Sequence, residues 1–214
     1  MNKSNILNDL ENKAANAEDL ARNVIEKPSL LAKIFDGISS DNARARFKSA
    51  KTLRIISEKK PTMLYSKMDF FIKLLDSKNN ILKWIAIDVI GNLASVDSEN
   101  KFDKLFNKYY GLLTDESMIT IGHVIDNSGK IAKAKPHLTQ EITNILLKIE
   151  NIPITPHITQ ECKNILFGKT IQAFGEFFDQ IKNKDAVISF VRKQLNNTRN
   201  ATKTKAEKFL TKYA

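Results

Sequence analysis

Hydrophobic residues recur every three or four positions along most of the chain, which is the spacing of one face of an α-helix. The stretch from Phe47 to Ile56 has this spacing at Phe47, Ala50, Leu53 and Ile56. The clearest stripe carries Leu82, Ile85, Ala86, Val89, Ile90 and Leu93. The pattern predicts amphipathic helices that bury their apolar sides against one another.

These helices are expected to come in pairs that repeat along the chain. Segments starting at Leu31, Phe71 and Tyr109 align as an apolar helix, a short polar turn and a second helix. One such hairpin cannot bury its apolar faces alone, whereas stacked hairpins share a continuous core. We expect repeat units at 28–60, 61–96, 98–135, 136–183 and 184–214, within a single domain over 1–214.

Residues 1–27 form a separate apolar pattern before the first repeat. We expect one leading helix there, with a polar opposite side that would suit an N-terminal cap. Its apolar side would carry Ile6, Leu7, Leu10, Ala14, Ala17, Leu20, Ala21, Val24 and Ile25.

The segment LLDSKNNILKWIAIDVIGNLA resembles the HEAT-repeat pattern. The positions that carry the resemblance are Asp76, Lys83, Ala86, Val89, Ile90, Gly91, Leu93 and Ala94. Gly129 and Gly175 hold the Gly91 position in neighbouring units. The resemblance implies an all-α fold of the HEAT/armadillo-like class: a short right-handed α-solenoid of about five hairpins with an N-terminal capping helix. It says little about function.

Composition agrees with long helices and few turns. The chain has 214 residues, of which 42% are hydrophobic and only 7 are Gly and 5 Pro. Its single cysteine, Cys162, excludes an internal disulfide framework and fits a reducing compartment. No apolar run is long enough for a signal peptide or a membrane span, so we expect a cytoplasmic protein.

The charge is basic and uneven, with a net charge of +10. Residues 41–60 hold seven basic and two acidic residues, a net charge of +5, and residues 181–214 hold nine and two, a net charge of +7. These windows indicate either solvated helix faces or a surface for an anionic partner. The candidate binding residues are Arg44, Lys48, Lys51, Arg54, Lys83, Arg192, Arg199 and Lys203.

Complete catalytic or metal-binding motifs are absent from the sequence. The segment Phe167–Thr170 ends like a phosphate-binding loop. Such a loop needs a second glycine five positions before Gly168, and that position holds Lys163. His123, His137 and His157 lack the spacing that aims two imidazoles at one metal. We therefore expect no cofactor and no metal.

One pair of residues suggests an enzymatic alternative. Trp84 and Asp88 lie four positions apart on the second helix of a unit, and so share one helix face. This arrangement is similar to that of the HEAT-like DNA alkylation repair glycosylases, where it implies a Trp that holds an alkylated base and an Asp that stabilises charge on the sugar. The chain departs from that family in having one Trp, and His123 or Asp126 where a supporting Arg is expected.

The sequence thus favours a non-enzymatic binding or scaffold module that presents a concave solenoid surface to another protein. The alternative is a sequence-independent nucleic-acid-binding solenoid that uses the basic helices in 41–60 and 181–214. Glycosylase-like activity at Trp84 and Asp88 is the third alternative.

Overall fold

A computed structural model describes residues 10–11 and 15–214, and all regular elements in this part of the chain are helical, as the sequence predicted. It divides into two compact units, unit 1 (1–98) and unit 2 (99–214). The prediction of a single domain with five repeat units stays a prediction.

The α-helices are α2 (Ala17–Glu26), α3 (Leu31–Ile38), α4 (Ala43–Lys59), α5 (Met68–Leu74), α6 (Asn80–Leu93), α7 (Lys101–Gly111), α8 (Met118–Ala134), α9 (Thr139–Leu147), α10 (Gln160–Phe177), α11 (Lys184–Lys193) and α12 (Asn200–Tyr213).

Short 3-10 turns connect many of these helices and extend others by one turn. They are η1 (Pro28–Leu30), η2 (Pro61–Met63), η3 (Tyr65–Lys67), η4 (Ala94–Val96), η5 (Leu112–Thr114), η6 (Pro136–Leu138), η7 (Lys148–Asn151), η8 (Phe178–Gln180) and η9 (Gln194–Asn196). None of the helices in the described part of the chain has the length and apolar character that crossing a membrane requires.

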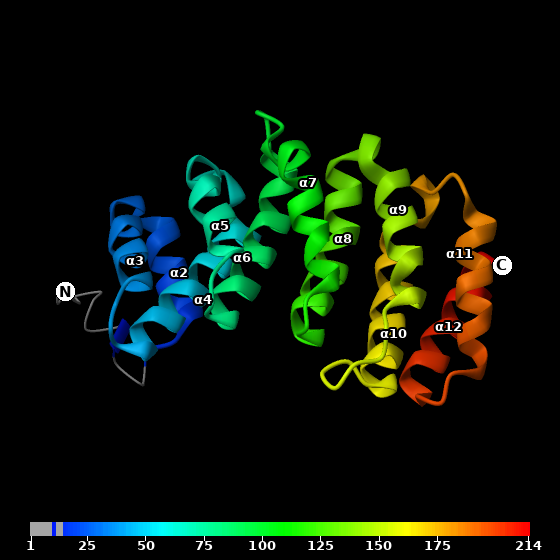
Figure 1. Cartoon of the computed structure of the whole chain (residues 1–214). Coiled ribbons are helices and arrows are strands. Elements are labelled where there is room, and N and C mark those ends of the chain that lie inside the picture. The colour runs from blue at the N-terminus through cyan, green and yellow to red at the C-terminus, as the bar shows by residue number, and fades with distance from the viewer. Residues whose placement is uncertain (1–9, 12–14) are drawn as a thin grey trace. The chain divides into compact units, whose positions relative to one another are not determined.

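Unit 1 consists of the hairpins α3–α4 and α5–α6, with α2 packed against α4 (Figure 1). The second helices of the two hairpins, α4 and α6, also pack against each other. Between the first helices, the rings of Phe35 and Phe70 meet edge to face with their centroids 5.2 Å apart, and Phe71 packs against both. These contacts bury the apolar stripes that the sequence pattern predicted.

The leading helix α2 starts later than the single helix predicted over 1–27. Asn16 has an extended backbone and accepts a hydrogen bond from the backbone N–H of Asp19 at 2.8 Å, so it caps a helix that begins at Ala17. A residue in this conformation interrupts the helical ladder, and the sequence pattern missed it because the apolar spacing continues across the break. Ile6, Leu7 and Ala14 of the predicted stripe lie outside the described residues.

Three Lys-Pro pairs end helices and start the next element. Lys27, Lys60 and Lys135 follow α2, α4 and α8, and each is followed by a proline that begins a 3-10 turn. The proline ring disfavours the helical conformation in the residue before it, and the three lysines accordingly have φ values of −128°, −150° and −127°. The chain therefore turns at these positions by a local steric rule.

The second helices α4, α6, α8 and α10 begin at side-chain caps, whereas α12 follows Arg199, whose side chain makes no cap hydrogen bond. Asn42, Asn79, Ser117 and Thr159 each accept a hydrogen bond from a backbone N–H in the first turn of α4, α6, α8 and α10 respectively. These contacts satisfy donors that have no partner inside a helix. The polar turns seen in the sequence thus define where these four helices start.

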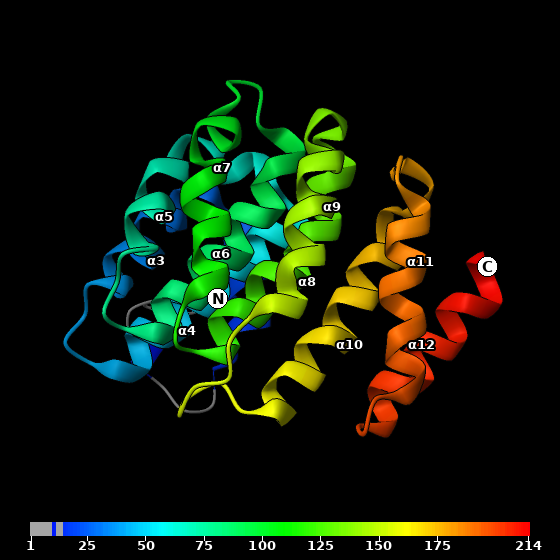
Figure 2. The same cartoon turned by 45° about the vertical axis from the view of Figure 1, so that its right-hand side comes forward.

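Unit 2 contains the hairpins α7–α8, α9–α10 and α11–α12. Its second helices α8, α10 and α12 pack side by side in one layer, and α9 and α11 contact each other in the other layer (Figure 2). The layers meet at aromatic side chains such as Phe174 and Phe190, whose ring centroids lie 5.8 Å apart. The α8–α10–α12 layer forms the face that carries the candidate site.

Glycines allow the helices of this layer to approach closely. A Cβ placed on Gly122 of α8 would lie 3.2 Å from the side chain of Lys169 on α10. A Cβ on Gly168 of α10 would lie 2.8 Å from the hydroxyl oxygen of Thr202 on α12. Side chains of each helix therefore lie across the backbone of the helix before it, which brings their polar ends together.

Candidate functional site

The exposed face of α8, α10 and α12 in unit 2 contains a polar groove of about 300 Å³. Side chains from all three helices line it, and they carry both signs of charge. We call this the inner groove, and its principal residues are Asp126, Lys169, Gln172, Glu176, Arg199 and Lys205.

Two of the cations in the inner groove are held by carboxylates. Lys169 of α10 forms an ion pair with Asp126 of α8, and Arg199 forms one with Glu161 of α10. Lys205 instead donates a hydrogen bond to the neutral amide oxygen of Gln172, with a distance of 3.1 Å between Nζ and Oε1. Lys205 is thus the cation that an anionic ligand could pair with.

Electrostatics at Lys205 agree with this geometry. Partial burial and repulsion by Lys169 and Arg199 lower the pKa of Lys205 below its ordinary value, and attraction by Asp126 opposes only part of that shift. Its ammonium group is therefore short of compensating negative charge. A carboxylate or phosphate placed beside it would be stabilised.

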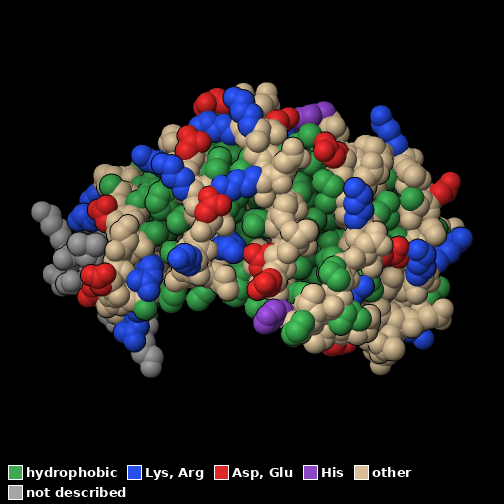
Figure 3. All heavy atoms as spheres, viewed as in Figure 1, with side chains coloured by type: hydrophobic (Ala, Val, Ile, Leu, Met, Phe, Trp, Pro, Cys, Tyr) green, Lys and Arg blue, Asp and Glu red, His purple; other side chains and the backbone are tan. Residues whose placement is uncertain are grey.

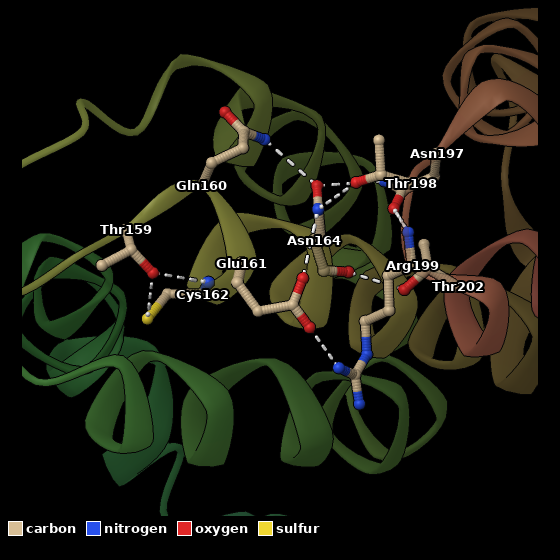
Figure 4. A network of polar contacts seen from close by, with 9 residues as sticks. All are labelled: Thr159, Gln160, Glu161, Cys162, Asn164, Asn197, Thr198, Arg199 and Thr202. Atoms are coloured by element: carbon tan, nitrogen blue, oxygen red, sulfur yellow. Dashed lines mark hydrogen bonds and ion pairs between the residues drawn. The ribbon is translucent and has the colours of Figure 1, made fainter.

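A hydrogen-bond network holds the start of α12 against α10 (Figure 4). The centre of the network is Asn164, which is buried and whose amide nitrogen donates to the Thr198 hydroxyl at 3.0 Å. Its amide oxygen accepts from Gln160 at 3.1 Å and from Asn197 at 3.2 Å. The Thr202 hydroxyl donates to the backbone carbonyl of Asn164 at 2.7 Å.

The same network positions Arg199. Its backbone N–H donates to the Asn197 side-chain oxygen at 2.9 Å, while its guanidinium reaches Glu161 (Figure 4). Both ends of the residue are therefore fixed, which preorganises one wall of the inner groove.

A row of lysines extends the inner groove along α12. Lys205, Lys208 and Lys212 border a shallow groove of about 240 Å³ between α10 and α12, together with Phe209 and Tyr213. The lysines are three and four positions apart, so they share one helix face and span about 10 Å along the axis. None of the residues lining this groove, all within the described chain, is acidic. We call these three residues the lysine row.

The predicted basic residues of unit 1 lie on α4 and α6. Arg44 and Lys51 are exposed on α4, and the Arg44 guanidinium donates to the backbone carbonyl of Glu11 at 3.2 Å. Arg54 pairs with Glu58 at 2.7 Å, which neutralises part of the positive charge that the sequence suggested. Lys48 and Lys83 are partly buried and take part in further contacts.

Of the predicted basic residues in unit 2, the structure brings only Arg199 into the inner groove. Arg192 lies exposed on α11, and Lys203 lies exposed on α12 but is not among the residues that line the groove. Sequence reasoning missed Lys169 and the lysine row. The spacing of Lys205, Lys208 and Lys212 was the available signal, because it places three cations on one helix face, whereas the intervening Glu207 falls on a different side of the helix.

The Trp84–Asp88 pair lies on α6 of unit 1. Both side chains are partly exposed, and both take part in interactions with other groups. Burial of Trp84 would have excluded a base-binding role, and Trp84 is not buried. The glycosylase-like role stays a hypothesis.

Metal-ligating residues do not cluster in the part of the chain that the structure describes, where no group of three His, Cys, Asp or Glu side chains could hold an ion. Cys162 is partly buried, and its sulfur accepts a hydrogen bond from the Thr159 hydroxyl at 3.3 Å.

The stacked helical hairpins define an α-solenoid of the HEAT/armadillo-like class, and solved structures confirm this fold. The chain is similar to an engineered protein, with a TM-score of 0.58 and 16% identity, over 99% of this chain and 96% of that one. It is also similar to a designed armadillo repeat protein, with a TM-score of 0.53 and 13% identity, over 96% of this chain and 90% of the other. No family model matches the sequence, and no curated protein matches it.

Proposed function

We propose that this chain is a non-enzymatic binding module that receives an acidic segment of another protein on the α8–α10–α12 face of unit 2. The observation that carries the proposal is the inner groove with its extension along the lysine row, where no carboxylate of the described residues forms an ion pair with Lys205. Solenoids commonly work through such extended surfaces. Charge complementarity would select the partner and accelerate its association.

The test is binding of a fluorescently labelled, glutamate-rich peptide to the full chain. The triple variant Lys205→Ala/Lys208→Ala/Lys212→Ala removes the lysine row, and Lys104→Ala/Lys182→Ala/Lys203→Ala removes three other exposed lysines of unit 2. Exposed ion pairs contribute about 0.2–1 kcal/mol each, so we expect the first variant to bind roughly tenfold more weakly. The control variant should bind nearly as well as the wild type. Equal losses in both variants would show that net charge, rather than this face, binds the peptide.

Nucleic acid is the second candidate partner. Arg192, Lys203 and Lys208 are exposed, and no acidic residue in the described part of the chain forms an ion pair with them. They could therefore contact phosphates. A random-sequence DNA duplex titrated across a salt series tests this candidate. Backbone binding predicts a log–log slope whose magnitude decreases by about one for each of Arg192→Ala, Lys203→Ala and Lys208→Ala.

Excision activity is tested separately, on an alkylated duplex with the wild type and Asp88→Asn. A binding module should release no base with either protein. Release by the wild type that Asp88→Asn abolishes would establish the enzymatic alternative instead.

A further inference from the structure

A second, apolar pocket of about 440 Å³ lies at the end of unit 2 where α7 turns into α8 and α9 leads into α10. Its floor is formed by the buried side chains of Tyr110, Leu113, Ile121, Ile149 and Ile158. Ile145, Ile152 and Pro153 form its more exposed walls. An open apolar hollow of this size marks a place where another apolar group can be buried.

A protruding isoleucine lies next to this pocket in the chain. Ile154 is 61% exposed, more than Ile119 at 45% and Ile81 at 39%. Its two neighbours, Pro153 and Thr155, both line the pocket. Figure 3 shows hydrophobic side chains gathered on this surface, at the end of unit 2 where α9 gives way to α10.

Hydrogen bonds shape the loop that presents Ile154. The Thr155 hydroxyl oxygen accepts from the backbone N–H of Ile158 at 2.9 Å and from that of His157 at 3.2 Å. The Thr155 N–H donates to the Ile158 carbonyl at 3.0 Å. This closed turn keeps Ile158 in the floor of the pocket while Ile154 stays at the surface.

Charged side chains of both signs lie at the rim of the pocket, where Asp115 is a second, partly buried carboxylate beside Glu116. Glu116 and Lys148 are both exposed lining residues, and neither forms an ion pair within the described chain. A partner for this surface therefore needs an apolar projection together with one acidic and one basic group. The surface itself offers all three.

We propose that a second copy of this chain occupies the pocket. In a two-fold dimer each copy inserts Ile154 into the pocket of the other, and Glu116 of each copy faces Lys148 of its partner. Such a contact is isologous, because the same patch supplies the projection and the hollow on both sides. The patch is small compared with stable interfaces, so the dimer forms weakly and its population depends on concentration. This inference uses residues outside the inner groove and the lysine row, and it is independent of the proposed acidic partner.

The experiment is analytical ultracentrifugation of the full chain from about 10 µM to about 1 mM, the range in which a small interface is populated. The mean mass should rise with concentration toward that of two chains. Ile154→Asp should keep the protein monomeric, because it would bury an unpaired carboxylate in the pocket. The matched control Ile81→Asp, at an exposed isoleucine of unit 1, should dimerise as the wild type does.

A charge exchange tests the pairing across the interface. Glu116→Lys and Lys148→Glu should each weaken the dimer, and the double variant should restore it, because opposite charges again face each other. A wild type that stays monomeric throughout, or equal dimerisation by Ile154→Asp and the wild type, overturns the proposal. A monomer whose pocket binds 8-anilinonaphthalene-1-sulfonate, with binding lost in Ile145→Asp, would assign the pocket to a small apolar ligand instead.

Discussion

Gly129 of α8 lies directly against Glu176 of α10: a Cβ placed on Gly129 would come within 2.8 Å of the Cβ of Glu176. That atom is attached to the helix backbone, so no rotation of the Glu176 side chain can move it away. The two helices can keep their separation only while position 129 has no side chain. This close packing is particular to Gly129, because a Cβ on Gly175, which holds the same repeat position, would meet Phe209 only at 3.8 Å.

Gly129→Ala should therefore destabilise unit 2, although alanine is normally the better helix former. Overpacking of this kind costs about 1–3 kcal/mol, which exceeds the gain of about 0.5–1 kcal/mol from helix propensity. Gly111, the last residue of α7, provides a control because a Cβ there would meet nothing within 4 Å. Gly111→Ala should raise stability by about 0.4–1 kcal/mol. Urea unfolding followed by circular dichroism measures both, and equal shifts would contradict the close-packing argument.

Tyr110 makes the stability of unit 2 sensitive to alkaline pH. Burial raises the pKa of Tyr110 well above its ordinary value of 10.0, and the hydrogen bond with Ser128 offsets only part of that shift. Above pH 10 the unfolded chain loses this proton while the folded chain retains it, so the contribution of Tyr110 to stability decreases as pH rises.

Tyr110→Phe should remove this part of the pH dependence. The variant loses the 3.3 Å hydrogen bond to the Ser128 oxygen, but the Ser128 hydroxyl still donates to the Val124 carbonyl, so its cost at neutral pH should be about 0.5–1.5 kcal/mol. Between about pH 9 and pH 11 the urea midpoint should fall less for Tyr110→Phe than for the wild type, since only the wild type has this buried phenol. Parallel curves would show that Tyr110 does not control the alkaline loss.

Much of the fold follows from local chemistry and could be predicted. The apolar spacing from Leu82 to Leu93 predicts α6, and Asn79 before it predicts the cap at which α6 begins. Lys-Pro pairs such as Lys60-Pro61 predict helix ends. The start of α2 was missed because the apolar pattern continues across Asn16. The extended backbone of Asn16 breaks the helix there, and its side chain caps the new helix that begins at Ala17.

The candidate site could be predicted less well, because it depends on how neighbouring helices align. Lys169 lies over Gly122, 47 positions earlier, whereas Thr202 lies over Gly168, only 34 positions earlier. The separation of 47 is larger because the long connection before α10 adds residues to the fourth unit. Equivalent positions on α8 and α10 are therefore further apart in sequence than those on α10 and α12. Net charge in a window located Arg199, but it could not show that Lys169 and Lys205 meet there.

Asp103 should govern the response of unit 2 to acid. Burial alone would raise the pKa of Asp103, but the hydrogen bond with His137 and the ion pair with Lys135 outweigh it and hold that pKa below its ordinary value. The stabilisation is therefore complete above about pH 4, the pKa of an unfolded aspartate, and is lost as pH falls through the lower pKa of the folded protein.

Asp103→Asn should abolish this acid-dependent loss and lower stability at neutral pH. The Lys135 side chain, only 6% exposed, would keep the Asn100 amide oxygen at 2.9 Å but lose the Asp103 carboxylate at 3.1 Å, at a cost of about 1–3 kcal/mol. His137→Gln removes one of the two contacts that lower the pKa of Asp103 and leaves the Lys135 contact intact, so it should reduce the acid-dependent loss without abolishing it. Urea midpoints measured between about pH 3 and pH 7 span the transition of the carboxylate. An unchanged acid profile in Asp103→Asn would rule out this assignment.

Asn164 and Asn144 allow the polar network beneath the inner groove to be tested with a matched pair. Each lies four residues after a glutamine that donates to its amide oxygen at 3.1 Å, within the similar segments Gln140–Asn144 and Gln160–Asn164. Asn144 is exposed on α9 and has that one hydrogen bond, whereas Asn164 is buried and connects α10 to α12.

Asn164→Ala should therefore cost about 1–3 kcal/mol, since it leaves buried polar groups without partners, while Asn144→Ala should stay within about 0.5 kcal/mol of the wild type. Loss of the network should also release Arg199, because Asn197 would lose its own contact with Asn164. Under the proposed function, Asn164→Ala weakens binding of the acidic peptide even where the protein remains folded. Full binding by folded Asn164→Ala would show that the network stabilises the fold without positioning the groove.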